Sequence, residues 1–123
     1  MSRDPRHHLG HVGEQLAAQH LERLGFDIVD RNYRTRHGEI DLVAFDGATL
    51  VFCEVKTRRA TRGSSPWDAL HPEKRTQVRR MSAAWLSEKP GRPYAEELRF
   101  DAIGVVFDAQ GRMVALDHLE AAF

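Results

Sequence analysis

Apolar residues recur every three or four positions near the start of the chain, which is the spacing of one face of an α-helix. This pattern runs from about residue 10 to Leu24, and Gly25 follows it, as glycine commonly does after a helix. A second stretch with helical spacing begins at Pro72 and continues to about Ser87. Proline is well tolerated in the first turn of a helix. The sequence therefore predicts two helices.

Between and after these stretches lie apolar runs rich in β-branched and aromatic residues, as in strands. They predict four strands and a short edge strand, at residues 26–34, 39–45, 48–58, 98–107 and 112–117. A loop is expected at residues 62–66 and a helical turn at residues 67–70. No repeat or long linker divides the chain. We expect one α/β domain over residues 1–123, with its core at about 9–118 and a mixed β-sheet flanked by helices.

The composition is that of a folded domain. Hydrophobic residues make up 41% of the 123 positions and charged residues 29%, which argues against disorder. No apolar run approaches the roughly 20 residues that a membrane helix requires. Cys53 is the single cysteine, so no internal disulfide can form. A cytoplasmic protein without a membrane partner is expected.

Charged residues interrupt the second and third predicted strands. Glu39 and Asp41 lie in "GEIDLVAF", and Glu54 and Lys56 lie in "LVFCEVKTR". Burying a charge is costly unless it is paired or binds a metal. These four residues therefore call for a chemical explanation.

A two-residue turn at Asp46-Gly47 would fix how the two strands pair. This turn places three pairs of residues opposite each other: Phe45 and Ala48, Asp41 and Phe52, Glu39 and Glu54. Because directly opposed side chains point to the same side of a sheet, all four charged groups would converge. A turn with an odd number of residues would separate them.

Converging carboxylates repel each other unless a cation lies among them, and an all-oxygen ligand set favours Mg²⁺ or Mn²⁺ over Zn²⁺. Asp41, Glu54 and Glu39 are the predicted metal ligands. Lys56 would orient the attacking water or offset the charge of a phosphoryl group. The alternative is a solvated hairpin with salt bridges such as Glu39–Lys56.

The first predicted helix carries two polar residues on its inward side. Glu14 lies there, either to join the carboxylate cluster or to reach water from the edge of the polar face. His20 also lies on the apolar side, and a core histidine with a satisfied hydrogen bond is the better interpretation. His7, His8 and His11 are interpreted as surface residues.

The net charge is zero, but it is unevenly distributed. The segment from Arg31 to Arg80 holds eleven Lys and Arg against six Asp and Glu. Such a segment suits either a phosphate-binding face or a solvated face of mixed charge. The candidate nucleic-acid contacts are Arg58, Arg59, Arg62, Lys74, Arg75 and Arg79. For Lys74, a lysine reaching water from a helix end is an equal alternative.

Several separated motifs occur in the order seen in a known family. They are "GEQLAAQHLERLGFDIVDRNYR", "GEIDLVA", "FCEVKTR", "HPEKRTQVRRMSAAWL" and "LRFDAIGVVF". The chain resembles the YraN family of small bacterial proteins, which is similar to archaeal Holliday-junction resolvases. The resemblance implies the restriction-endonuclease-like fold of the PD-(D/E)xK superfamily. Ile40 stands where the superfamily name has proline, and no ligand is lost by this change.

The resemblance also implies roles for individual residues. Asp41 matches the metal-binding aspartate, Glu54 and Lys56 match the E-x-K pair, and Glu14 matches the glutamate of the resolvase-like first helix. Glu39 and Lys74 match residues typical of the YraN family itself. Catalytic roles are thus expected for Asp41, Glu54, Lys56 and Glu14.

Three functions follow as expectations. The first is a Mg²⁺- or Mn²⁺-dependent endonuclease acting on DNA, with branched or single-stranded DNA among its substrates. The second is a nucleic-acid-binding module of the same fold that does not cleave without a partner in DNA repair or uptake. The third is a structural interaction protein. Because resolvases commonly act as symmetric dimers, a homodimer is an alternative to a monomer.

Overall fold

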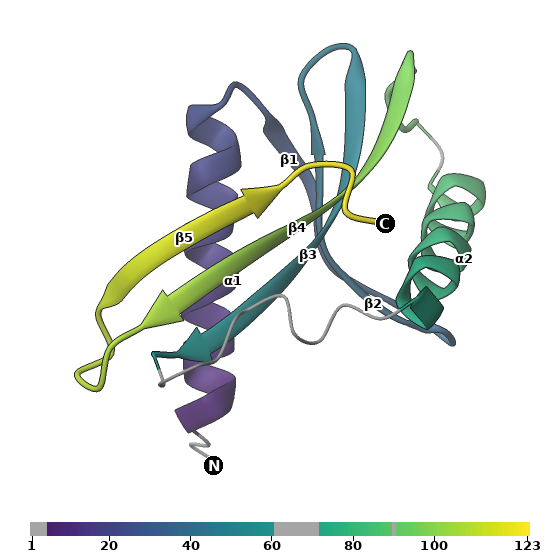
Figure 1. Ribbon diagram of the computed structural model, residues 1–123. Coiled ribbons are helices and arrows are strands. Elements are labelled where there is room, and N and C mark those ends of the chain that lie inside the picture. Colours follow the sequence, from purple (N-terminus) through teal and green to yellow (C-terminus); the bar gives the residue numbers. More distant parts are fainter. Residues whose placement is uncertain (1–4, 61–71, 90) are drawn as a thin grey trace.

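The structure is a computed structural model that describes residues 5–60, 72–89 and 91–123. Its elements are α1 (Pro5–Arg23), β1 (Asp27–Thr35), β2 (Gly38–Phe45), β3 (Thr49–Arg59), α2 (Pro72–Glu88), β4 (Glu97–Phe107) and β5 (Met113–Leu119), shown in Figure 1. The predicted α/β class and element order are confirmed. The loop expected at 62–66 and the turn expected at 67–70 lie outside the described residues. Within the described ranges, no helix is long and apolar enough to cross a membrane.

The strand boundaries agree with the prediction to within two residues, but α1 starts earlier than expected. It begins at Pro5 rather than near residue 10. Proline is favoured at the first helical position because its fixed φ suits a helix and its missing N–H has no intrahelical partner there. The first turn is polar and rich in histidine, so no apolar spacing marks it in the sequence.

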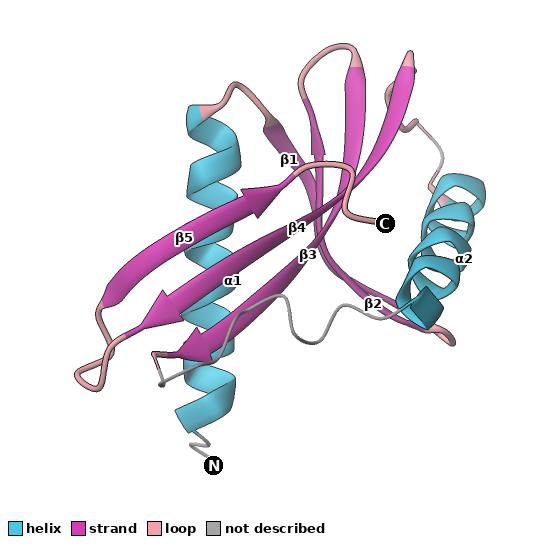
Figure 2. Cartoon of the chain, viewed as in Figure 1, coloured by secondary structure: helices cyan, strands magenta, loops and turns pink. Residues whose placement is uncertain are grey.

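All five strands form one mixed sheet in the order β1-β2-β3-β4-β5. The β3–β4 pair is parallel, and the other neighbours are antiparallel. The chain segment between β3 and β4 contains α2, as a crossover between parallel strands requires. Figure 2 shows α1 along one face of the sheet and α2 beside the β1–β2 end of the other face.

Each helix encloses its own part of the hydrophobic core. Between α1 and the sheet lie Leu21, Leu42, Val51 and other buried residues that face this helix. Between α2 and the sheet, Trp85 is 1% exposed and packs edge-on against Phe52, with 5.6 Å between ring centroids. Both faces of β2 and β3 are thus covered along the part where these two strands pair.

The turn between β2 and β3 differs from the prediction. Phe45 pairs with Leu50, so four residues rather than two form the loop. The carboxylate of Asp46 accepts hydrogen bonds from the N–H groups of Ala48 (2.9 Å) and Thr49 (2.7 Å), which closes this wider turn. The predicted register is therefore wrong by two positions in all three of its pairs: Phe45 with Ala48, Asp41 with Phe52, and Glu39 with Glu54. Because the shift is even, the faces of both strands are unchanged.

Beyond this turn, β2 and β3 pair only as far as Leu42 and Cys53 and then separate (Figure 1). From there β2 remains paired with β1 down to Gly38, while β3 remains paired with β4 up to Arg59. Asp41 and Glu54 are the next residues away from the turn on β2 and β3. They therefore lie where the backbone hydrogen bonds between these two strands have ended.

Candidate functional site

Three carboxylates from two elements meet where β2 and β3 separate. Glu14 comes from α1, and Glu39 and Asp41 come from β2; one oxygen of each lies within 4.8 Å of the others. We call these three residues the acidic cluster. The helix approaches the sheet closely here, because a Cβ atom on Gly13 would lie 2.3 Å from Oγ1 of Thr57 on β3. The glycine thus brings the neighbouring Glu14 to the sheet.

Asp41 is the most buried member of the acidic cluster. Its Oδ2 accepts a hydrogen bond of 2.8 Å from the backbone N–H of Val55. Burial raises the pKa of Asp41 to about 7, and the charges of Glu14, Glu54 and Glu39 add to this effect, although the Val55 bond opposes it. Within the part of the chain that the structure describes, no ion pair compensates the charge of Asp41.

Glu14 and Glu39 share a partner that the sequence analysis did not identify. The side-chain amide of Asn32, with its nitrogen facing the carboxylates, donates to Glu14 (2.9 Å) and to Glu39 (2.7 Å). Burial and the charge of Glu39 raise the pKa of Glu14, while the Asn32 bond lowers it. Asn32 has a φ of 51° within β1. Asparagine is depleted in strands and tolerates this backbone region. An asparagine inside a predicted strand was therefore the feature of the sequence that could have pointed to Asn32.

Glu54 lies beside the acidic cluster but has its own partners. Its Oε1 pairs with Lys56 (2.9 Å) and Lys74 (2.8 Å). Its Oε2 is buried and has no hydrogen-bond partner among the residues that the structure describes. The expectation that all four charged groups converge is met only in part: Asp41 and Glu39 belong to one group, and Glu54 and Lys56 to the next.

A small cavity of about 10 Å³ joins the two groups. Glu39 and Glu54 both line it, and its remaining lining is mostly apolar, with Phe52 and Met81 among the residues. The Glu39–Lys56 salt bridge considered for a solvated hairpin is absent from the described residues. Glu39 instead approaches Arg34 at 3.5 Å on the neighbouring strand.

The residues present fit a hard divalent cation. The donors are all carboxylate oxygens, which Mg²⁺ and Mn²⁺ prefer. Burial raises the pKa values of Asp41 and Glu14, and neighbouring carboxylates raise them further. Glu54 has a buried oxygen without a hydrogen-bond partner among the residues that the structure describes. This acidic cluster could therefore hold a metal ion.

The predicted nucleic-acid contacts lie in two places. Arg58 and Arg59 end β3, where Arg58 shares the strand face of Glu54 and Lys56. On α2, Lys74 pairs with Glu54, and the Arg79 guanidinium lies 5.0 Å from the centre of the Phe100 ring. Arg75 is exposed on the same helix. Arg62 lies outside the described residues.

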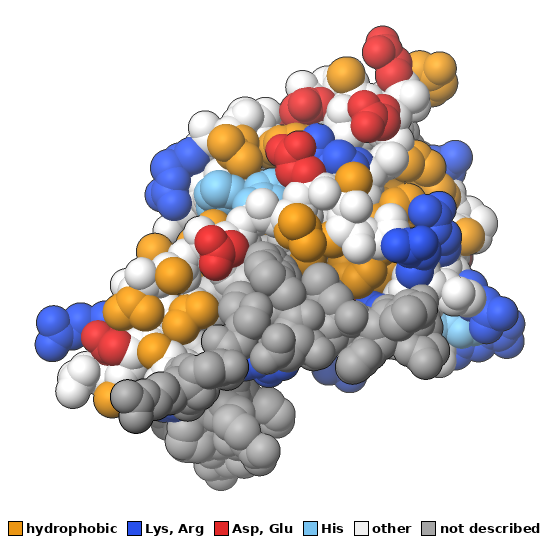
Figure 3. All heavy atoms as spheres, in the orientation of Figure 1, with side chains coloured by type: hydrophobic (Ala, Val, Ile, Leu, Met, Phe, Trp, Pro, Cys, Tyr) orange, Lys and Arg blue, Asp and Glu red, His pale blue; other side chains and the backbone are white. Residues whose placement is uncertain are grey.

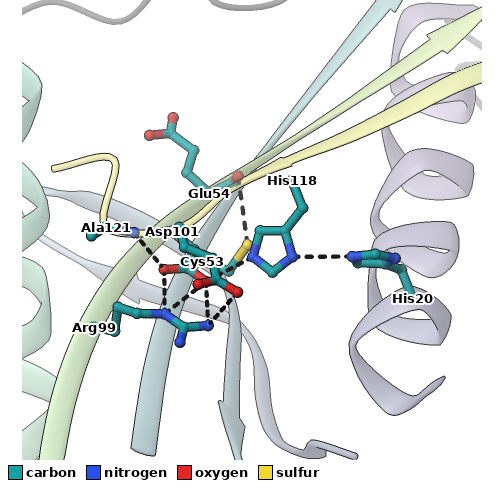
Figure 4. A network of polar contacts seen from close by, with 8 residues as sticks. His20, Cys53, Glu54, Arg99, Asp101, His118 and Ala121 are labelled. Atoms are coloured by element: carbon teal, nitrogen blue, oxygen red, sulfur yellow. Dashed lines mark hydrogen bonds and ion pairs between the residues drawn. The ribbon is translucent and has the colours of Figure 1, made fainter. Parts of the chain in front are cut away.

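A fully buried aspartate, Asp101, has the opposite environment, shown in Figure 4. Asp101 on β4 is fully buried and accepts hydrogen bonds from three groups: the Arg99 guanidinium at 2.9 Å, a ring nitrogen of His118 at 2.7 Å and the Ala121 N–H at 3.0 Å. Burial alone would raise the pKa of Asp101, but these bonds outweigh it and lower the pKa. Asp101 is thus electrostatically satisfied and stabilises the fold.

This network also involves His20. Its Nε2 lies 3.0 Å from Nδ1 of His118, which links α1 to β5 (Figure 4). The predicted hydrogen bond of His20 is confirmed, but the side chain is half-buried at the edge of the core rather than within it. Burial, followed by the nearby His118 and Arg23, lowers the pKa of His20. The surface assignment of His8 and His11 is also confirmed, since both are exposed.

Comparison with known proteins identifies the class. Residues 13–105 match the uncharacterised protein family UPF0102, and the chain belongs to this family. It is 47% identical over 116 residues to a UPF0102 protein of Frankia casuarinae, covering 94% of this chain and 95% of that protein. It is 44% identical over 115 residues to a UPF0102 protein of Nocardia farcinica, covering 94% and 88%. The YraN-like resemblance is thereby confirmed.

Proposed function

We propose that this protein is a divalent-cation-dependent nuclease that hydrolyses phosphodiester bonds in DNA. The observation that carries the proposal is the acidic cluster of Glu14, Glu39 and Asp41, placed next to the Glu54–Lys56 pair at the point where β2 and β3 separate. The restriction-endonuclease-like fold implied by the YraN resemblance supports the same chemistry. Both the substrate and the catalytic roles belong to the proposal.

The acidic cluster would hold the cation through Asp41, Glu14 and Glu39. Glu54 would contribute Oε2, which has no hydrogen-bond partner among the described residues. A bound Mg²⁺ or Mn²⁺ supplies polarisation of the phosphate and activation of a water molecule. In the hydrolysis, the water oxygen gives up a proton to solvent and forms a bond to phosphorus, the bond to the leaving sugar oxygen breaks, and that oxygen takes up a proton from solvent.

Lys56 is the side chain best placed to act on the reacting groups. The Glu54 carboxylate holds its ammonium group at 2.9 Å, so the lysine is oriented before substrate binds. Its N–H donors can hold the attacking water or offset charge on the phosphoryl oxygens. Lys74, which shares the same carboxylate oxygen, would position Glu54 and contact a neighbouring phosphate.

A binding module that does not cleave is the second candidate. One observation favours it: two lysines already neutralise Glu54, so this carboxylate needs no metal to be stable. Such a module would bind DNA with the salt dependence typical of phosphate contacts and show no turnover with any metal. The homodimer also stays a prediction.

The test is a cleavage assay with duplex, single-stranded, flap and four-way-junction DNA in the presence of Mg²⁺ or Mn²⁺. Lys56→Met and Glu54→Gln are the informative variants, because each removes one charge while retaining a side chain of similar length. We expect metal-dependent cleavage by the natural chain and a loss of at least about 100-fold in both variants. Equal cleavage by the variants would exclude this site, and binding without any cleavage would favour the second candidate.

A further inference from the structure

A groove runs between the β1–β2 turn and α2, outside the acidic cluster. The turn contributes residues 34–37, and α2 contributes Arg80, Ala84, Ser87 and Glu88 to a hollow of about 590 Å³. A second hollow, of about 370 Å³, is lined by Thr76, Gln77 and also by His37 and Arg80. Because His37 and Arg80 line both hollows, the hollows adjoin, and we call the two together the basic groove.

Side-chain contacts hold the walls of the basic groove in place. The Thr35 hydroxyl donates to the Gly38 carbonyl and accepts from the His37 N–H, both at 3.0 Å, and these bonds close the turn. The Gln77 side chain on α2 donates to the His37 carbonyl. A Cβ atom at position 38 would lie 2.7 Å from Gln77 Nε2. The backbone φ of Gly38, 133°, also favours glycine. The turn therefore rests directly on α2, and the groove is formed before any ligand arrives.

The lining is strongly cationic. Arg34, Arg36 and Arg80 are exposed, and Glu88 is the single acidic side chain among the residues that line the two hollows. The carboxylate of Glu88 accepts a hydrogen bond from the Tyr33 hydroxyl. Figure 3 shows Lys and Arg side chains gathered on the side of the molecule where α2 lies. A pocket for a small molecule is mostly apolar, whereas this lining suits an extended anion.

The basic groove reaches the acidic cluster through one contact. Arg34 lines the groove and pairs across the β1–β2 ladder with Glu39, and its Nε lies 3.5 Å from the Glu39 carboxylate. Arginine binds phosphate oxygens with two parallel hydrogen bonds. A single nucleic-acid strand, with its regularly spaced phosphates, would occupy the basic groove and extend from there to the acidic cluster.

We infer that the basic groove binds the sugar–phosphate backbone of DNA and guides it to the acidic cluster, with Arg36 and Arg80 as the principal contacts. The direction of the strand toward the acidic cluster rests on the proposed function, but binding in the groove does not. Phosphate contacts position a nucleic acid without reading its sequence. The groove therefore contributes affinity across sequences.

The test measures binding by fluorescence anisotropy of labelled single-stranded and duplex DNA in EDTA, over a range of salt concentrations. The variant is R36E/R80E. The matched control is R23E/R112E, which makes the same change in net charge at exposed positions on the α1 C-terminus and the β4–β5 turn. Neither groove arginine belongs to the acidic cluster. Circular dichroism and urea unfolding confirm that each variant folds.

We expect R36E/R80E to lose at least about tenfold in affinity relative to the control and to reduce the salt slope by about 1–2. Should R36E/R80E fail to fold, R36Q/R80Q replaces it, with a smaller loss in the same direction. Glu88→Gln, which can still accept the Tyr33 hydrogen bond, should tighten binding.

Equal affinity of the groove variant and the control would overturn the inference. A second result would also overturn it. If inorganic phosphate raises the melting temperature of the natural chain but not of R36E/R80E, while R36E/R80E binds DNA as well as the natural chain does, the groove is a site for small anions. EDTA removes any cleavage from the readout. A failure of the proposed nuclease function would leave this binding result intact, and a failure of the groove would leave metal-dependent cleavage to be measured separately.

Discussion

The carboxylate of Asp41 accepts a 2.8 Å hydrogen bond from the backbone N–H of Val55, across the point where β2 and β3 separate. The pairing of the two strands ends at Leu42 and Cys53, so this side chain takes the place of a backbone acceptor on β2. The bond fixes Asp41 beside Glu54 and buries its charge. This arrangement is costly in the absence of a cation, and it leads to the first two predictions.

Asp41→Asn should stabilise the metal-free protein and abolish its response to metal. Asparagine retains an oxygen to accept the Val55 hydrogen bond but removes a buried charge from a cluster of carboxylates. We expect a gain of roughly 1–3 kcal/mol in the free energy of unfolding at about pH 8. Urea unfolding with EDTA measures this gain, and melting curves with and without Mn²⁺ measure the lost response. A destabilised variant that still responds to Mn²⁺ would contradict the prediction.

The stability of the metal-free chain should carry a pH signature from Asp41. The folded-state pKa is raised from its usual value to about 7, so the folded state binds the proton more tightly than the unfolded chain. The stabilising contribution is present below about pH 4 and is lost as the pH rises through about 7. Because metal ions compete with this proton, the rise in melting temperature caused by Mn²⁺ should be larger at about pH 8 than at about pH 5. An equal rise at both pH values would argue against Asp41 as a ligand.

Asp101→Asn should have the opposite effect on stability. The Asp101 carboxylate accepts from both Arg99 and His118 through its two oxygens. Asparagine keeps one acceptor oxygen, but it removes the charge opposite Arg99 and turns an NH₂ group toward these donors. We expect a loss of about 2–4 kcal/mol in the free energy of unfolding near pH 7. Because the folded pKa of Asp101 is lowered, its contribution is present above the unfolded pKa and is lost as the pH falls through the folded pKa. The difference between the variant and the natural chain should therefore shrink in acid, and a constant difference would refute this account.

The contact between Gly13 and Thr57 should appear as a non-additive pair. Gly13→Ala alone places a methyl group against Thr57 Oγ1 and should cost about 1–3 kcal/mol. In Thr57→Ala the obstructing oxygen is absent, so adding Gly13→Ala should instead gain up to about 1 kcal/mol from helix propensity. A double-mutant cycle by urea unfolding measures the coupling. Additive effects would show that the helix does not lie this close to β3.

The boundaries of the strands could be predicted because apolar runs and turn residues mark them directly. The register between β2 and β3 could not, since Asp46 accepts from two N–H groups and thereby widens the turn by two residues. The first turn of α1 was missed because its residues have no apolar spacing. Each error came from side-chain hydrogen bonding or helix-end effects that hydrophobic patterning does not record.

The candidate site was predicted in its residue types more than in its contacts. Asp41, Glu39 and Glu14 meet where the β2–β3 pairing ends, and Asn32 on β1 donates hydrogen bonds to Glu14 and Glu39. Hydrophobic patterning marks neither feature. The binding of Lys74 to Glu54 joins residues that are far apart in sequence, and nothing in either segment alone specifies it. The Asp101–His118 pair was missed for the same reason.

The most direct test of the central claim is a crystal structure of the protein grown with Mn²⁺, with anomalous diffraction recorded to locate the ion. The account predicts one strong anomalous peak coordinated by oxygens of Glu14, Glu39 and Asp41, at about 2.0–2.3 Å, and no such peak in crystals of Asp41→Asn. A map without a peak between these carboxylates at saturating Mn²⁺, or an equal peak in the variant, would contradict it.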